Sequence, residues 1–221
     1  MTVSTVINPN TPYGLRVVTR LDGAVTSFRM RKYFIPQAQT NALFVGDPVV
    51  KIHAAADTNG IMAVDLATGG TTNRITGAIV GFLGTCTAGS GKTPSLWGLG
   101  GTGGMISRPA TTALDYYALV CDDPEAQFLV QSSNNFGGVA GTAIPLSNIG
   151  LNACLVAGTG STTSGLSGWQ LDANTAPATT VGFQVNIIGF DVDPYNAALA
   201  QFQKIVVRNN ISTETNALTG I

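Results

Sequence analysis

Three short apolar runs joined by turn residues are the feature that most limits how this chain can fold. They lie at Phe44–Ile52, Ile61–Val64 and Gly77–Leu83 and are rich in Val and Ile. Gly, Asn, Asp and Pro separate them, including the pair Asn59-Gly60, which is the pattern of consecutive β-strands joined by tight turns. The stretch predicts a β-scaffold and contains no pattern typical of catalysis.

The same pattern continues along the chain. Further strands are predicted at residues 15–18, 28–35, 116–121, 126–131, 150–157, 168–172, 181–191 and 202–208. Within 181–191 the alternation places Val185 and Ile187 on one face and Gln184 and Asn186 on the other. We therefore predict an all-β fold, either an antiparallel β-barrel or a jelly-roll-like β-sandwich, and the sequence leaves these two open.

The strands predict a single β domain over residues 15–208. An extended N-terminal arm, residues 1–14, precedes it, because two prolines remove backbone donors and favour extended backbone before them. The arm is either a disordered tail or a segment laid over a partner. A C-terminal tail, residues 209–221, is expected to be a second arm. Within the domain, a long Gly-rich loop is predicted at residues 84–109, and loops of this length are usually functional or disordered.

The charge content limits the classes of partner. Charged residues make up 10% of the chain, against about 25% in an average soluble protein. Such a surface is either covered in part by neighbouring subunits or built from polar uncharged strands. The net charge is −1 and the 11 Lys and Arg residues are spread out, which argues against nucleic-acid binding. No apolar run reaches 18 residues, so no membrane span is expected.

The densest basic cluster is Arg29-Met30-Arg31-Lys32. Successive strand residues face opposite sides, so Arg29 and Arg31 would share one face. This pattern is typical of a protected edge strand, and it is also compatible with contact to an acidic partner surface.

Motifs for chemistry are incomplete. Gly89-Ser90-Gly91-Lys92-Thr93 resembles the end of a phosphate-binding loop, but Cys86 stands where the motif needs glycine and the following glycines disfavour a helix. The acidic residues at 122–125 are explained by a turn between two strands. The three cysteines have no metal-ligand spacing and are expected to be buried thiols, and His53 is the only histidine. We expect no cofactor, no metal and no enzymatic activity.

Several segments together resemble a group of tailed-bacteriophage virion proteins. They are Tyr13–Arg16, Tyr33–Pro36, Leu43–Val49, Gly77–Phe82, Leu119–Pro124, Gly158–Gly165 and Val206–Asn210. Members of this group are regarded as capsid decoration, or cement, proteins. The resemblance implies a non-enzymatic all-β protein that binds the outside of the shell, and the insert 84–109 departs from the shorter form typical of the group.

The resemblance predicts a mechanical role, in which a rigid β-core carries arms and loops that touch neighbouring major capsid subunits. The expected partners are the major capsid protein and further copies of the chain, with a trimer preferred over a dimer. The protein would be made in the cytoplasm of the host bacterium and reside on the capsid exterior. The predicted contact residues are Val3, Val6, Ile7, Pro9, Arg29, Arg31, Trp97, Leu99, Leu218 and Ile221. The alternative is a phage surface or tail domain that binds host glycans by stacking Trp97 or Trp169 on sugar rings.

Overall fold

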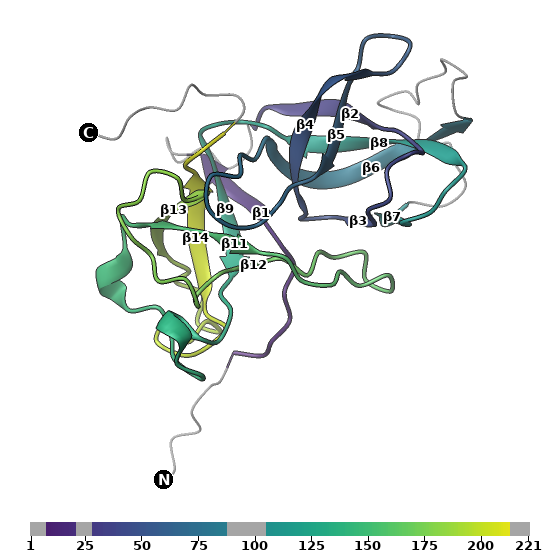
Figure 1. The fold of residues 1–221 in the computed structure, drawn as a ribbon. Coiled ribbons are helices and arrows are strands. Elements are labelled where there is room, and N and C mark those ends of the chain that lie inside the picture. The colour runs from purple at the N-terminus through teal and green to yellow at the C-terminus, as the bar shows by residue number, and fades with distance from the viewer. Residues whose placement is uncertain (1–7, 21–27, 88–104, 213–221) are drawn as a thin grey trace.

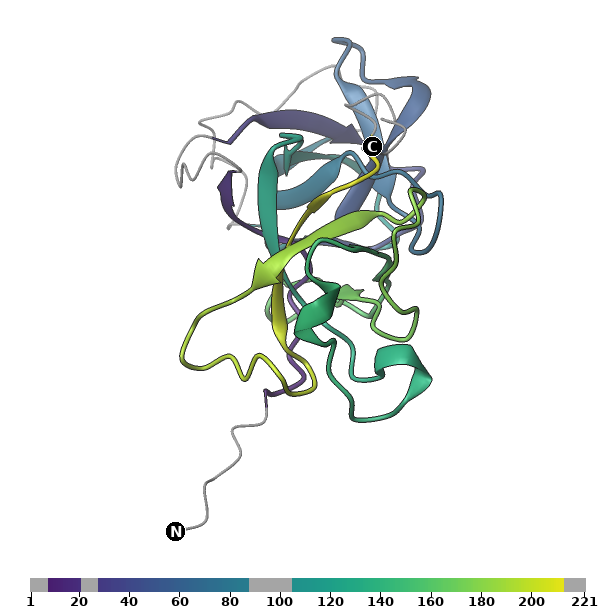
Figure 2. The ribbon, with the colours of Figure 1, turned by 90° about the vertical axis from the view of Figure 1, so that its left-hand side faces the viewer.

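Two β-sheet units, a closed barrel and an open sheet, make up the computed structural model of the chain (Figure 1). The structure describes residues 8–20, 28–87 and 105–212. A view turned by 90° keeps the barrel above the open sheet (Figure 2). The expected all-β fold is confirmed, and the barrel alternative describes the first of the two units.

The barrel has five strands in the order β2-β5-β4-β6-β8. These are β2 (Met30–Ile35), β4 (Pro48–Ala56), β5 (Met62–Leu66), β6 (Gly77–Thr87) and β8 (Leu114–Cys121). Neighbours run antiparallel except β2 and β5, which are parallel. Alternate side chains form the barrel core, among them Tyr33, Ile35, Val49, Val64 and Val120.

The open sheet has the order β1-β9-β14-β13-β10. Its strands are β1 (Arg16–Arg20), β9 (Ala126–Gln131), β10 (Asn152–Ala153), β13 (Val185–Phe190) and β14 (Lys204–Asn209). Two small pairs complete the strands: β3 (Leu43–Phe44) with β7 (Ser107–Arg108), and β11 (Leu155–Val156) with β12 (Gln170–Leu171). The helical elements are short 3-10 turns, η1 (Phe136–Gly138) and η2 (Leu146–Asn148), and no helix in the described ranges is long and apolar enough to cross a membrane.

One apolar core joins the two units. Phe128 and Val207 of the open sheet belong to the same buried cluster as Ala78 and Cys121 of the barrel. Trp169, which is 2% exposed, is the largest fully buried side chain of this cluster. The barrel and the sheet therefore share one continuous interior. Burial of apolar side chains is the dominant favourable contribution to folding, so this shared interior holds the two units together.

Gln184 is completely buried, as Val185 and Ile187 are, although the alternation predicts it on the opposite face from them. Its amide nitrogen donates to the carbonyls of Thr68 (2.9 Å) and Asn73 (3.1 Å). Its amide oxygen accepts from the backbone N–H groups of Gly70 and Leu155, both at 3.1 Å. Gln184 precedes β13, so the strand alternation does not govern it. Three of its four hydrogen bonds fasten the barrel's 68–73 loop to the sheet unit, and the fourth joins it to Leu155.

Arg108 is also fully buried. It belongs to β7, so the loop predicted at residues 84–109 is wrong at this end. Its guanidinium donates to backbone carbonyls, including those of Gln39 (2.6 Å) and Asn41 (2.5 Å), and so holds the chain between β2 and β3. At the other end of the predicted loop, β6 continues to Thr87 because β8 provides a backbone partner as far as Leu114. Residues 88–104 lie outside the described part of the chain.

The structure also differs in part from the predicted arms and from the strand predicted at 150–157. Asn8 is 2% exposed, and residues 8–14 lie along the sheet unit, so this part of the predicted arm belongs to the body. After β14, Ile211 and Ser212 are buried too, and Ser212 forms a bridge with Ile75. The strand predicted at 150–157 is divided into β10 and β11, which pair with different strands.

Candidate functional site

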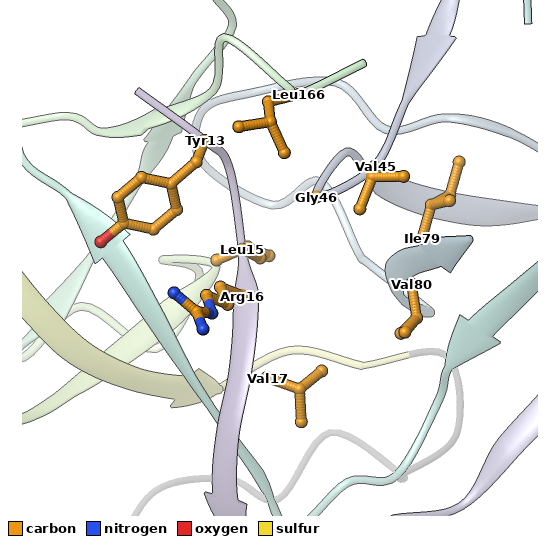
Figure 3. Close-up of a pocket in the computed structure, with 9 residues that line it drawn as sticks. All are labelled: Tyr13, Leu15, Arg16, Val17, Val45, Gly46, Ile79, Val80 and Leu166. Atoms are coloured by element: carbon orange, nitrogen blue, oxygen red, sulfur yellow. The ribbon is translucent and has the colours of Figure 1, made fainter. Parts of the chain in front are cut away.

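An apolar groove of about 440 Å³ lies between β1 and the barrel. Figure 3 shows its lining, which comes from the N-terminal segment and β1, from the turn after β3, from β6 and from the loop before β12. The lining residues are Tyr13, Leu15, Arg16, Val17, Val45, Gly46, Ile79, Val80 and Leu166. Because most of these side chains are aliphatic, the groove suits an apolar segment rather than a polar small molecule.

Two glycines make this groove by letting two backbones meet. The N–H of Leu15 donates to the carbonyl of Gly46 at 2.8 Å, and the N–H of Gly46 donates to that of Ile79 at 2.8 Å. Both Gly14 (φ +72°) and Gly46 (φ +93°) have left-handed backbone. A Cβ on Gly14 would lie 2.2 Å from the Gly46 oxygen, and a Cβ on Gly46 would lie 2.2 Å from the Tyr13 oxygen. Only glycine fits at either position.

A buried carboxyl group, that of Asp47, stands beside the groove. Asp47 is 2% exposed, and its Oδ2 accepts from the N–H of Phe44 at 2.8 Å. Burial raises the pKa of Asp47 to about 6, although hydrogen bonds from the Ser167 hydroxyl and from Phe44 lower it. Val45 exchanges backbone hydrogen bonds with Gly165 and Ser167, so the Asp47 turn ties the barrel to that loop.

Tyr13 lies at the edge of the groove with its hydroxyl directed away from it (Figure 3). The hydroxyl is buried without a hydrogen-bond partner in the structure. Burial raises the pKa of Tyr13, and the nearby charge of Asp191 raises it further. The ring therefore serves as an apolar wall of the groove.

Arg29 and Arg31 share one face, as the alternation predicts, but the strand that carries Arg31 is not an edge. β2 is enclosed between β5 and β8, because the barrel closes. Both Nε atoms face the buried carboxylate of Asp122, at 3.0 Å from Arg29 and 3.5 Å from Arg31. The turn predicted at 122–125 is present, and its first carboxylate is thus bound by both arginines.

An exposed apolar loop connects β13 to β14 at the end of the sheet unit away from the barrel (Figure 2). Val192 is 95% exposed, Tyr195 80% and Leu199 68%. The same loop is fastened to the N-terminal segment, since Asn8 donates to the carbonyls of Ala197 and Gln201 and accepts from the N–H of Ala197. The N-terminal chain therefore joins the body beside an apolar surface.

The predicted contact residues are only partly covered by the structure. Pro9 is exposed, and its carbonyl accepts a hydrogen bond from Gln131 at 2.8 Å. Outside the described residues lie Val3, Val6, Ile7, Trp97, Leu99, Leu218 and Ile221. The sequence analysis does not identify the apolar loop, although Val192 and Tyr195 flank the turn residues Asp193-Pro194, where an apolar side chain has no strand to pack on.

The described residues show no metal-binding cluster and no activated thiol. They contain no group of three or more His, Cys, Asp or Glu side chains that could hold a metal ion. Cys121 and Cys154 are buried free thiols, as expected, and burial raises the pKa of Cys121 to about 11. A thiol with a raised pKa is a poor nucleophile. His53 is exposed on β4.

Comparison with known proteins gives no match: no family model, no curated protein and no solved structure corresponds to this chain.

Proposed function

We propose that this protein is a structural, non-catalytic virion protein that binds the outside of a bacteriophage capsid and clamps neighbouring major capsid subunits. The observation that carries the proposal is the apolar loop at residues 191–203, where Val192, Tyr195 and Leu199 expose most of their side chains. Apolar side chains gathered on one exposed loop are typical of a surface that a partner covers. The resemblance to capsid decoration proteins points to the major capsid protein as that partner.

The N-terminal segment extends the same contact surface. Asn8 is held by three hydrogen bonds to the apolar loop. Val3, Val6 and Ile7 lie within five positions before this anchored residue in the sequence. In the proposed complex these side chains and the loop contact one capsid subunit together. Linking weak contacts raises their effective concentration, and the avidity exceeds that of either contact alone.

A clamp also needs a second contact and a body that transmits force between the two. The groove beside β1 provides an apolar surface on another part of the molecule (Figure 3). Gln184 and the shared core connect the barrel to the sheet unit. We therefore propose that one subunit is held at the loop and a second subunit, or a further copy of this chain in a trimer, is held elsewhere on the body.

The test is binding to capsid shells that lack the protein. Tyr195→Ser combined with Leu199→Ser removes apolar area that would contribute about 1.5–3 kcal/mol per buried side chain. We expect affinity for the shells, measured by co-sedimentation, to fall at least about tenfold. Val139→Ser is the matched control, because Val139 is 58% exposed on a different loop. Equal binding by the double variant and the unmodified chain would refute this contact surface.

One of the two tryptophans on which the glycan-binding alternative depends is buried. Trp169 is 2% exposed and packs in the core, so it cannot stack on a sugar ring. Trp97 lies outside the described residues. No described residue specifically favours a glycan site, and a glycan array would test this alternative directly.

A further inference from the structure

The polar mouth of the barrel, where Arg31 and Lys51 line a pocket, is not one of the two contact surfaces of the capsid proposal, although Arg31 is a predicted contact residue. On β2, Tyr33 and Ile35 belong to the barrel core, so Arg31 continues on the same side of the strand. On β4, Lys51 follows Val49 in the same way. Alternation therefore brings two cations from different strands to one end of the barrel interior.

The buried carboxylate of Asp122 lies beside Arg31 at this end of the barrel. The Asp122 side chain is 0% exposed, and it accepts from the Tyr33 hydroxyl at 2.8 Å and from Arg29 Nε at 3.0 Å. Arg31 Nε lies 3.5 Å from its other oxygen. Two guanidinium groups thus share one carboxylate, while the Arg29 and Arg31 side chains remain 38% and 52% exposed to solvent.

Lys51 adds a third cation close to the same carboxylate. Its Nζ lies 5.8 Å from the centre of the Tyr33 ring. Burial lowers the pKa of Lys51, Asp122 raises it, and Arg31 and Arg29 lower it again. Lys51 therefore lies near enough to Arg29 and Arg31 for their charges to act on one another.

A pocket of about 220 Å³ opens beside these cations. Its lining residues are Arg31, Lys32, Tyr33, Lys51, Gly60, Ile61 and Met62. This volume is below the roughly 300–1,000 Å³ of sites for larger ligands, and it suits one small charged group. The planar fork of an arginine and the compact ammonium of a lysine are the side chains that bind carboxylate and phosphate oxygens.

We propose that the mouth of the barrel binds a single oxyanion group, held between Arg31 and Lys51. The group is a carboxylate or a phosphate, because both present charged oxygens to the two cations. Two sources of this chemistry are a small inorganic anion and an acidic side chain of a protein partner. The site is a property of the isolated chain and does not depend on the capsid proposal.

The test uses the purified full-length chain and two probes at constant ionic strength. Inorganic phosphate represents the small anion, and a short, otherwise uncharged peptide with one Glu represents the protein side chain. We expect saturable amide shifts in β2 and β4 by NMR for at least one probe. Lys51→Met should weaken that binding at least about tenfold, because it keeps the side-chain length and removes the charge.

Two further variants keep this test decisive. Arg31→Gln should also weaken binding at least about tenfold, while Asp122 retains Arg29 and Tyr33 as partners. Lys204→Met on β14 is the matched control and should bind as the unmodified chain does. Binding of phosphate alone identifies a small-anion site, and binding of the peptide identifies a protein carboxylate site. The absence of saturable shifts with both probes, or unchanged binding by Lys51→Met and Arg31→Gln in the folded state, would overturn the proposal.

Discussion

The buried carboxyl of Asp47 should make the stability of this protein decrease as the pH rises from 4.5 to 7.5. Its pKa is raised from 3.8 to about 6 in the folded chain, mainly by burial. A carboxyl with a raised pKa favours the folded state when it is protonated. The stabilising contribution is therefore lost as the pH rises from the unfolded pKa through the folded one, and the full penalty is present above about pH 7.

The magnitude follows from the shift. About two pKa units correspond to about 3 kcal/mol, at 1.36 kcal/mol per unit. Because the unfolded carboxyl is already largely ionised at pH 4.5, about 2 kcal/mol of this total falls between pH 4.5 and 7.5. A change of this size is a large fraction of the stability of a typical domain.

The assay is denaturant unfolding at several pH values between 4.5 and 7.5, at fixed ionic strength. Asp47→Asn has nearly the same shape and no titration, so we expect its free energy of unfolding to lose most of this pH dependence. The carboxyl of Asp47 accepts from the N–H of Phe44 and is hydrogen-bonded by Ser167, and an amide oxygen in its place would accept the bond from Phe44 in the same way.

Asp57→Asn is the control for this experiment. Burial raises the pKa of Asp57, but hydrogen bonds from Ile61, Tyr117 and Asn59 outweigh it, so the net pKa is lowered. The stability that Asp57 contributes is lost mainly below its unfolded pKa of 3.8, outside the tested range. The Asp57 variant should keep the slope of the unmodified chain. An Asp47→Asn variant that keeps the same slope would refute the assignment of this pH dependence to Asp47.

Two further predictions concern the connections between segments. Gln184→Met should lower the free energy of unfolding by at least about 3 kcal/mol, because it leaves buried backbone groups without their partners. The control is Gln37→Met at an exposed glutamine, which should change the denaturation midpoint little. Gly14→Ala should destabilise the fold more than Gly60→Ala does. Both glycines have positive φ, but only a Cβ on Gly14 meets backbone, the Gly46 oxygen at 2.2 Å, whereas nothing lies within 4 Å of one on Gly60. Equal thermal midpoints of the two alanine variants would contradict the close approach at the groove.

Much of the local structure could be predicted from the sequence. The strand expected at Ala126–Gln131 is present with the same bounds, and the Asn59-Gly60 turn separates β4 from β5. These features depend on residues that are neighbours in the chain, such as β-branched runs and the glycine and asparagine of a turn. The shared face of Arg29 and Arg31 likewise follows from alternation within one short segment.

The candidate sites could be predicted only in part. The sequence predicts Arg29 and Arg31 as partner-contact residues, but Asp122, which contacts both, comes from the turn after β8, and Lys51, which lines a pocket with Arg31, comes from β4. The groove combines segments as distant as Leu15 and Leu166, and no local pattern indicates that these meet. The exposure of Val192, Tyr195 and Leu199 depends on what surrounds the loop, which composition does not specify.

The sequence by itself determined that this chain is all-β, where most of its strands lie and which side chains alternate on them. Only the tertiary structure decided that β2 is enclosed in a barrel, that Gln184 and Arg108 are buried connectors, and that the apolar groove lies between β1 and β6. The physical reason is that strand pairing and burial arise from contacts between residues far apart in the chain. A single pattern of alternating residues is compatible with several such pairings, and packing selects one of them.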